Sequence, residues 1–339
     1  MIRAAIVGLG RWGRALVDAT SGKRDTGDLQ FVVGTTRTRA TAEDFCRQRR
    51  IALVDSYDEI LRDPDIDGVV LATPHSQHQS QALAAIAARK HVFVEKPLTL
   101  DLASARAVAE AAHKAGLILA TGFTRRFHPS IAEMRARLAD GRLGQAISFV
   151  AQHTTSTAQF IAPDNWRAAP EEAPGGAFTA VGVHALDHMI EFGGQVADVR
   201  CLTARHHAGP SDDTTTAMLR FASGASGLIF CSVATATNFA FTAYGTKGLA
   251  EITRADLSHF RFTPASTAAP TGLVVAPSDE VLEFAGFDML QAQMVAFART
   301  IRDGNSYPVP IADVLHGMAV FDAIVASAKR GGDAIAVNE

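Results

Sequence analysis

A strand-like run at the start of the chain passes directly into a glycine turn, and this junction restricts the possible fold more than any other segment. Residues 2–7 have the composition of a buried strand, and residues 14–19 are typical of a helix. Between them, Gly8, Gly10 and Gly13 occupy the fixed positions of a G-x-G-x-x-G turn. Strand, glycine turn and helix in this order predict the phosphate cradle of a dinucleotide-binding fold.

Each glycine has its own task in such a turn. Gly8 permits the sharp bend, Gly10 removes a side chain where the pyrophosphate must approach, and Gly13 lets the helix and the strand pack closely. The helix N-terminus offers N–H groups and a partial positive charge to the phosphates. We therefore expect these glycines, with Arg11 and Trp12 between them, to bind the cofactor.

The bulk properties exclude several classes of function. A chain of 339 residues suggests about two domains. Its net charge of −3 gives no reason to expect nucleic acid or an anionic membrane as a partner. We expect neither a signal peptide nor a membrane span. Cys46, Cys201 and Cys231 are odd in number and far apart, which is typical of the reducing cytoplasm.

Apolar strands and helices alternate through the first third of the chain. Strands are expected at residues 31–34, 68–72, 91–95 and 117–120, and helices at 41–50, 80–89 and 101–115. Ser56 and Glu59 have the spacing of a capping box, and Gly116 is a typical helix C-cap. Such alternation predicts a parallel sheet covered on both faces, hence an α/β Rossmann domain at residues 1–123.

The pattern changes from about residue 125 onward. Strands are expected at residues 146–153, 199–204, 214–221, 226–232, 239–244 and 250–253, and helices at 129–140, 288–303 and 311–330. Because few helices separate these strands, residues 124–339 are predicted to form an α+β domain with a largely antiparallel sheet. Residues 263–276 are rich in Pro, Thr, Ala and Gly, which predicts an exposed loop.

The segment after the second expected strand bears on the choice of cofactor. Sites that prefer NAD usually carry Asp or Glu here, whereas this chain has Thr36, Arg37 and Arg39. Hydroxyl and guanidinium groups suit a 2′-phosphate, so the sequence predicts that NADP is preferred over NAD. The alternative is that Arg37 and Arg39 are solvated loop charges.

Three further motifs follow the later strands. They are Thr73-Pro74 with His78, Glu95-Lys96-Pro97, and Gly122-Phe123-Thr124-Arg125-Arg126-Phe127. Together with the glycine turn, in this order and spacing, they resemble the glucose–fructose oxidoreductase, inositol dehydrogenase and MocA (Gfo/Idh/MocA) family.

The resemblance implies a set of functional residues. Cofactor contacts are expected from Thr73, Pro74, His78, Glu95 and Lys96, and substrate contacts from Phe123 and Arg125. It also implies a cis peptide between Lys96 and Pro97, and a homodimer or homotetramer built on the open face of the second sheet.

Two segments of the second half resemble the active-site elements of the family. Trp166-Arg167 is similar to a W-R element near the nicotinamide. Residues 175–188 resemble G-G-x-x-x-D-x-G-x-H-x-x-D, with His184 and Asp187 on the expected positions. The family has Asp four residues before the histidine, but this chain has Ala180, which carries no proton.

The resemblance and general acid–base chemistry suggest roles for these residues. Lys96 is expected to bond the reacting oxygen and His184 to give or take the proton. Asp187 would orient His184 or contact substrate. The alternatives are non-catalytic: Lys96 pairs with a surface acid, or His184 is a histidine buried in the core. His184, Asp187 and His188 superficially suggest a metal site, but no distant ligand is evident and no metal is expected.

The leading hypothesis is an NADP-dependent oxidoreductase that transfers hydride between the nicotinamide and a hydroxyl or carbonyl carbon. The resemblance implies a sugar, sugar acid or cyclitol as the small-molecule substrate. Ala180 and Thr124 suggest a less polar pocket, so a cyclic diol or an aldehyde from aromatic breakdown is an alternative. Ala180 also leaves open a dinucleotide-binding sensor without turnover.

Overall fold

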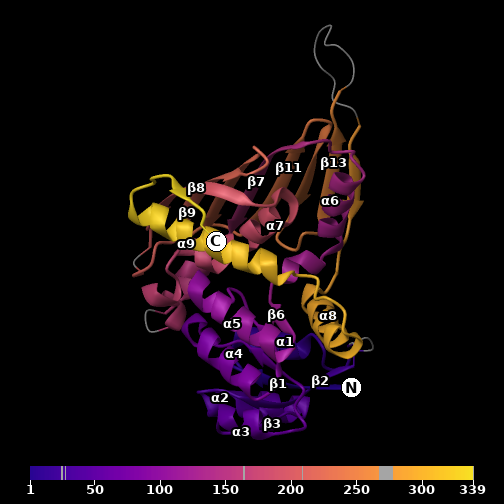
Figure 1. The fold of residues 1–339 in the computed structure, drawn as a ribbon, viewed down its shortest axis with the longest axis vertical. Coiled ribbons are helices and arrows are strands. Elements are labelled where there is room, and N and C mark those ends of the chain that lie inside the picture. Colours follow the sequence, from indigo (N-terminus) through magenta and orange to yellow (C-terminus); the bar gives the residue numbers. More distant parts are fainter. Residues whose placement is uncertain (24–25, 27, 163–164, 208, 267–277, 339) are drawn as a thin grey trace. The chain divides into compact units, whose positions relative to one another are not determined.

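The chain divides into two structural units. The computed structural model describes residues 1–23, 26, 28–162, 165–207, 209–266 and 278–338. The first unit comprises Met1–Thr124 and Asp288–Leu315, and the second Arg125–Phe287 and His316–Glu339 (Figure 1).

The first unit is built on a parallel sheet. Within its described residues, six strands lie in the order β3-β2-β1-β4-β5-β6, and every neighbouring pair is parallel. They are β1 (Ile2–Val7), β2 (Leu29–Thr35), β3 (Ala52–Leu53), β4 (Gly68–Leu71), β5 (His91–Val94) and β6 (Leu119–Thr121). The strand order reverses between β1 and β4, which is the switch point where such sheets bind ligands. The predicted Rossmann fold is confirmed.

The helices of the first unit begin and end close to where the sequence predicts. They are α1 (Arg11–Asp18), α2 (Arg39–Arg49), α3 (Tyr57–Arg62), α4 (His78–Ala87), α5 (Leu102–Ala115) and α8 (Met289–Asp303). Ser56 and Glu59 form the expected capping box at the start of α3. Gly116 ends α5 in the left-handed conformation, with φ of 65°.

Helix α8 belongs to the first unit, so the expectation of an unbroken second domain over residues 124–339 was wrong at this point. The helix contacts α1, β1 and β2. On its buried face, the ring of Phe297 lies 5.7 Å from that of Phe93 on β5. The sequence marks α8 as amphipathic, but periodicity does not tell which sheet its apolar face covers.

The second unit contains the predicted, mainly antiparallel sheet. Across its described ranges, nine strands lie in the order β14-β13-β12-β11-β7-β10-β9-β8-β15, and only β7 and β10 pair in parallel. They are β7 (Ala146–Thr154), β8 (Val196–Ala204), β9 (Thr214–Phe221), β10 (Ser226–Ser232), β11 (Asn238–Gly245), β12 (Gly248–Thr253), β13 (His259–Pro264), β14 (Glu280–Glu283) and β15 (Ile335–Ala336). Of the expected loop at 263–276, the first two residues end β13 and residues 267–276 lie outside the described ranges.

Helices cover one face of this sheet. They include α6 (Pro129–Ala139), α7 (Val183–Gly193) and, from His316 onward, α9 (Ile311–Lys329). Helix α7 packs on β7 and β10. On β9 and β10, buried and exposed residues alternate, so every second side chain faces away from α7. We call this second surface the open face.

Among the described residues, one helix is long and apolar enough to cross a membrane by length and composition, namely α9. Half of its most apolar 18-residue window is buried within the protein. In the second unit, Phe321 packs against Phe178, and His316 Nε2 accepts a hydrogen bond from the backbone N–H of Val196 at 2.9 Å. These contacts make α9 a core helix of that unit.

A buried ion pair fastens α7 within the second unit. Both carboxylate oxygens of Asp187 accept hydrogen bonds from Arg126 Nε, at 2.9 and 3.0 Å. The two side chains are only 3% and 4% exposed. Glu191, one turn further along α7, lies 3.7 Å from the same Nε atom and also pairs with Arg135.

Replacing Arg126 with Met is expected to lower the free energy of unfolding by about 3–5 kcal/mol, because Asp187 is left as a buried, unpaired charge. The double variant Arg126→Met/Asp187→Leu should recover part of that loss, since neither buried charge remains. Urea unfolding of the wild type and both variants measures the difference. Equal losses in the single and double variants would contradict this account.

Candidate active site

The glycine turn has the shape that a pyrophosphate requires. Gly8 has a φ of 92°, and a Cβ there would lie 2.6 Å from the carbonyl oxygen of Ala72. A Cβ on Gly13 would lie 1.9 Å from the carbonyl oxygen of Gly8. A Cβ on Gly10, by contrast, would meet no described atom within 4 Å. Gly8 and Gly13 therefore serve the packing of the unit, whereas Gly10 keeps space open at the N-terminus of α1.

The helix that follows this turn is suited to an anion. Gly10 is its N-cap, and the first intrahelical bond runs from Arg14 N–H to the Gly10 carbonyl. The N–H groups of Arg11, Trp12 and Gly13 precede that bond and so have no carbonyl one turn earlier in the helix to bind. Arg11 and Trp12 are exposed, and the guanidinium of Arg11 lies 5.6 Å from the indole centroid.

The structure distinguishes the two arginines after β2. Arg39 forms ion pairs with Asp55 and Glu43, so its charge is already balanced at the start of α2. Arg37 is exposed, and Thr36 beside it is half-buried. Both follow β2 at the carboxyl edge of the sheet, where a cofactor ribose is bound in this fold. Of the two, Arg37 is the better placed to hold a 2′-phosphate.

His78 joins two of the predicted motifs. It is fully buried at the start of α4, with Nδ1 2.9 Å from the Pro97 carbonyl oxygen and Nε2 3.2 Å from that of Thr73. Its position links the segment after β4 to the segment after β5. The expected cofactor contact of His78 stays a prediction, and the structure shows that its side chain connects two segments of the unit.

The neighbouring motif residues lie around this histidine. Thr73 donates its hydroxyl hydrogen to Gln81 Oε1 at 2.6 Å, and Pro74 precedes the short 3-10 helix η1 (His75–Gln77). The peptide between Lys96 and Pro97 is cis, as the resemblance implies.

The segments that follow β5 and β6 also lie close together. Glu95 and Lys96 are half-buried just beyond β5. A Cβ on Gly122, just beyond β6, would lie 3.0 Å from Glu95 Oε1, and half-buried Phe123 follows Gly122. The E-K-P and G-F motifs are therefore neighbours at the same edge of the sheet.

In the second unit, His184 stands on the first turn of α7. It follows a π-helical turn, η6 (Phe178–Gly182). Gly182 permits this turn to pack, because a Cβ there would lie 2.4 Å from the ring of Phe178 and 3.0 Å from Cys231 Sγ. Ala180, where the family has Asp, is exposed on this turn.

A cluster around His184 includes His153, which no sequence pattern singled out, and Arg125, for which the resemblance implies a substrate contact. The ring of His153, on β7, lies 5.9 Å from that of His184. Arg125, in the short helix η2 (Thr124–Phe127), places Nη2 3.1 Å from His153 Nε2, and its guanidinium lies 4.3 Å from the centroid of Phe239. His153 alternates with Phe149 and Ala151 toward the buried face of β7. A polar residue at a position that the alternation assigns to the buried face is the sequence signal that could have identified His153.

Other predicted residues have structural partners within the second unit. Asp187 is committed to Arg126 rather than to His184. His188 packs beside Phe239 and Phe241, so the H-x-x-D-H spacing does not correspond to three side chains directed at one point.

Trp166 and Arg167 are half-buried in η4 (Trp166–Ala168), where the Arg167 guanidinium lies 4.2 Å from the Trp166 ring centroid. Lys96 belongs to the first unit and His184 to the second.

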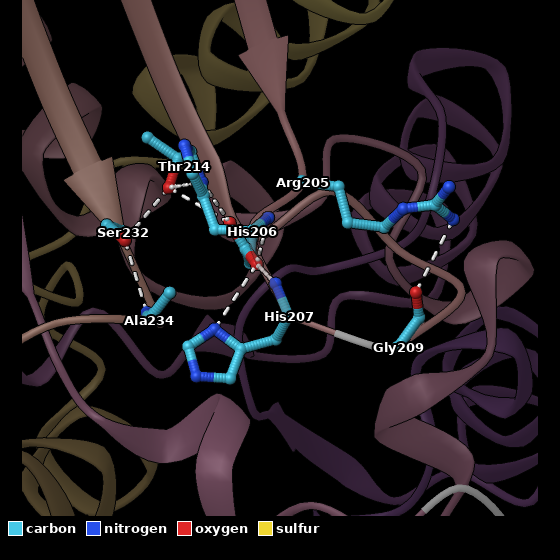
Figure 2. A network of polar contacts seen from close by, with 8 residues as sticks. Arg205, His206, His207, Gly209, Thr214, Ser232 and Ala234 are labelled. Carbon is cyan, nitrogen blue, oxygen red and sulfur yellow. Dashed lines mark hydrogen bonds and ion pairs between the residues drawn. The ribbon is translucent and has the colours of Figure 1, made fainter.

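A polar network supports the segment that leads into α7. The buried carboxylate of Asp213 accepts hydrogen bonds from the backbone N–H groups of His206 and His207 at 2.8 and 2.7 Å, and from Thr214 Oγ1 at 3.0 Å. Figure 2 shows this network, which continues from Thr214 to Ser232. Both histidine side chains retain exposed surface.

This network holds the loop before β9 against the glycines of residues 175–176. The backbone N–H of Ala177 donates to the carbonyl oxygen of Asp212 at 3.0 Å. A Cβ on Gly176 would lie 2.3 Å from that same oxygen, so only glycine allows the contact. The loop thereby supports the turn that carries His184.

The family follows from the sequence as well as from this geometry. Residues 2–123 match the family described as "Oxidoreductase family, NAD-binding Rossmann fold", and residues 131–251 match the "GFO/IDH/MocA C-terminal domain". The chain belongs to the Gfo/Idh/MocA family of oxidoreductases.

The chain is similar to several named members of the family. It is 28% identical to trans-1,2-dihydrobenzene-1,2-diol dehydrogenase of Bos taurus over 225 residues, which is 66% of each chain. The match thus spans a little under two thirds of the relative's length. It is 38% identical to 1,5-anhydro-D-fructose reductase of Ensifer adhaerens over 138 residues, 40% of each chain. Levoglucosan dehydrogenase, solved with NADH and levoglucosan, shares the fold with a TM-score of 0.90 at 21% identity, covering 100% of both chains.

The Asp213 network predicts a pH-dependent contribution to stability. Burial raises the pKa of Asp213, but the hydrogen bonds from His206, His207 and Thr214 outweigh it and lower the pKa to about 2. Because this lies below the unfolded value, the contribution is fully present above about pH 4 and is lost as the pH falls toward 2.

Asp213→Asn is therefore expected to lower the free energy of unfolding by about 2 kcal/mol at pH 7 and by progressively less between pH 4 and pH 2. Chemical unfolding across that range measures the difference between variant and wild type. Asp212→Asn is the matched control, since the exposed Asp212 uses its backbone carbonyl. A difference independent of pH would contradict the role of the charge.

Proposed function

We propose that this protein is an NADP-dependent dehydrogenase or reductase that transfers hydride between the nicotinamide and a hydroxyl or carbonyl carbon of a sugar-like or cyclic polyol substrate. The observation that carries the proposal is the open space at Gly10, at the N-terminus of a helix in a domain of an NAD-binding family. The names of its relatives support the substrate class, since they denote enzymes of a dihydrodiol, an anhydrofructose and levoglucosan.

The chain's own residues supply positioning and proton transfer. The bound nicotinamide would supply the hydride acceptor or donor. Gly10 and the first turn of α1 would hold the pyrophosphate. Lys96 would donate a hydrogen bond to the reacting oxygen, and His184 would take its proton on oxidation or return it on reduction. Trp166, Arg167 and Phe123 are proposed contacts of cofactor and substrate.

Turnover is tested by following NADPH absorbance with aldoses, inositols, sugar acids and cyclic diols. Lys96→Ala should lower kcat about a hundredfold or more and change NADPH affinity far less, because its main effect is to remove a group that acts on the reacting oxygen. Gly10→Ala should do the reverse and weaken NADPH binding without lowering Tm, since its Cβ fills only open space. An unchanged rate in Lys96→Ala would remove that residue from the mechanism.

A second candidate function is a dinucleotide sensor, which Ala180 favours because the family's Asp is missing. Tight NADPH binding with no turnover of any substrate in the panel would support the sensor. Turnover would exclude it.

The cofactor preference is tested at Arg37. Arg37→Ala is expected to weaken NADPH binding about tenfold to a hundredfold and to change NADH binding little, because it removes a charge-assisted bond to the 2′-phosphate. Arg39→Ala is the matched control, since Arg39 already pairs with Asp55 and Glu43. Fluorescence titration gives both dissociation constants. Tighter NADH than NADPH binding by the wild type would overturn the preference.

The open face of the second sheet supports a homo-oligomer as the state of the protein. Leu228 on β10 stands directly opposite Met218 on β9, and both are exposed. Phe230 and Tyr244 are exposed on the same surface, as is Leu202 on β8. Contiguous apolar surface of this kind is typical of a protein–protein interface, and we propose that a second copy of the chain covers it.

Met218→Glu/Leu228→Glu is expected to convert the oligomer to monomers, because the charges cannot be buried between two copies. Light scattering after size-exclusion chromatography measures the mass. Phe160→Glu, an exposed apolar position outside the sheet, is the control. A wild type that is already monomeric, or a double variant of unchanged mass, would contradict the interface.

A further inference from the structure

We propose that Arg125 binds a carboxylate of the substrate, so that the enzyme acts on a hydroxy acid of the sugar-acid class rather than on a neutral polyol. This inference rests on the proposed function, because it names the substrate class of the same site.

Arg125 is a partly buried cation whose hydrogen-bonding capacity is largely unused. A guanidinium carries five N–H donors. Nη2 donates to His153 Nε2 at 3.1 Å, and one face of the group lies over Phe239. Nη1 has no solvent-exposed surface and no hydrogen-bond partner among the described residues. The residue as a whole is half-buried, so it keeps some exposed surface although Nη1 has none.

The other two buried arginines of this unit provide an internal comparison. Arg126 pairs with Asp187, and Arg137 pairs with Glu133 and Glu280. Within the described residues, Arg125 forms no ion pair with a carboxylate. A desolvated cation is costly unless an anion pairs with it, so the missing partner is expected to arrive with the ligand. Burial lowers the pKa of Arg125 to about 10, which leaves it charged at neutral pH.

His153 fixes the direction of this guanidinium. Its Nδ1 lies 3.0 Å from the carbonyl oxygen of Val181, which only accepts, so Nδ1 carries the hydrogen and donates. Nε2 therefore presents a lone pair, which accepts the hydrogen bond from Arg125 Nη2. Neutral His153 thus positions Arg125 without adding a second charge.

The same histidine relates Arg125 to the proton-transfer residue. The His153 ring contacts that of His184 at a centroid separation of 5.9 Å. His153 thus contacts both the guanidinium that would hold the anion and the ring that would move the proton, which suits an acid whose carboxylate is a few bonds from the reacting hydroxyl. A single guanidinium also matches the single charge of a carboxylate better than the charge of a phosphate dianion.

The kinetic test compares matched substrates. Wild-type protein is assayed with D-gluconate and D-galacturonate, with the neutral sorbitol and galactose, and with glucose 6-phosphate. We expect kcat/KM for an acid to exceed that for its neutral counterpart at least about tenfold. Arg125→Gln should lower kcat/KM for acids about tenfold to a hundredfold, mainly through KM, and should lower it much less for neutral substrates. Arg125→Lys keeps the charge and should lose less.

A binding measurement separates this inference from the proposed function. D-gluconate, at matched ionic strength with NaCl, should raise the Tm of the wild type and of Arg106→Gln, an exposed arginine on α5, but not that of Arg125→Gln. If this holds without turnover, the anion site stands and the proposed reaction fails. The inference would be overturned if acids and neutral polyols gave the wild type equal kcat/KM and equal rises in Tm. It would also be overturned if the wild type preferred the phosphate ester alone.

Discussion

The backbone of α1 approaches the end of β1 so closely that no side chain fits between them. A Cβ on Gly13 would stand 1.9 Å from the carbonyl oxygen of Gly8, and one on Gly8 would collide with the carbonyl of Ala72 beyond β4. This approach brings the N-terminus of α1 to the edge where the strand order reverses. The other motifs of the first unit follow parallel strands that end at the same edge, so their arrangement depends on this packing.

The second unit depends on an equivalent anchoring of one helix. The pair of Arg126 and Asp187 fastens α7, and the contact of Gly182 with Phe178 and Cys231 shapes the turn before it. His184 thereby stands on a helix rather than on a loop, which would favour precise placement of the acid–base group that we propose it to be. Two adjacent arginines at the start of the unit differ, because Arg126 pairs with the carboxylate of Asp187 and Arg125 has no carboxylate partner among the residues that the structure describes.

Much of this could be predicted from local sequence, because local physics decides it. The glycine turn, the capping box at Ser56 and the C-cap at Gly116 depend on a few neighbouring residues, and all three form as expected. The interior role of His78 could not be predicted in this way. Its partners are carbonyls of Thr73 and Pro97, and the latter lies 19 residues away along the chain.

The sequence by itself determined the class of each sheet, the position of the phosphate cradle and the family, because strand period, glycine spacing and motif order are properties of the linear chain. Only the tertiary structure decided that α8 belongs to the first unit, that Asp187 pairs with Arg126, and that His153 contacts both Arg125 and His184. Each of these depends on which distant surfaces bury one another, and a buried charge or helix face is satisfied by whatever partner the fold brings to it.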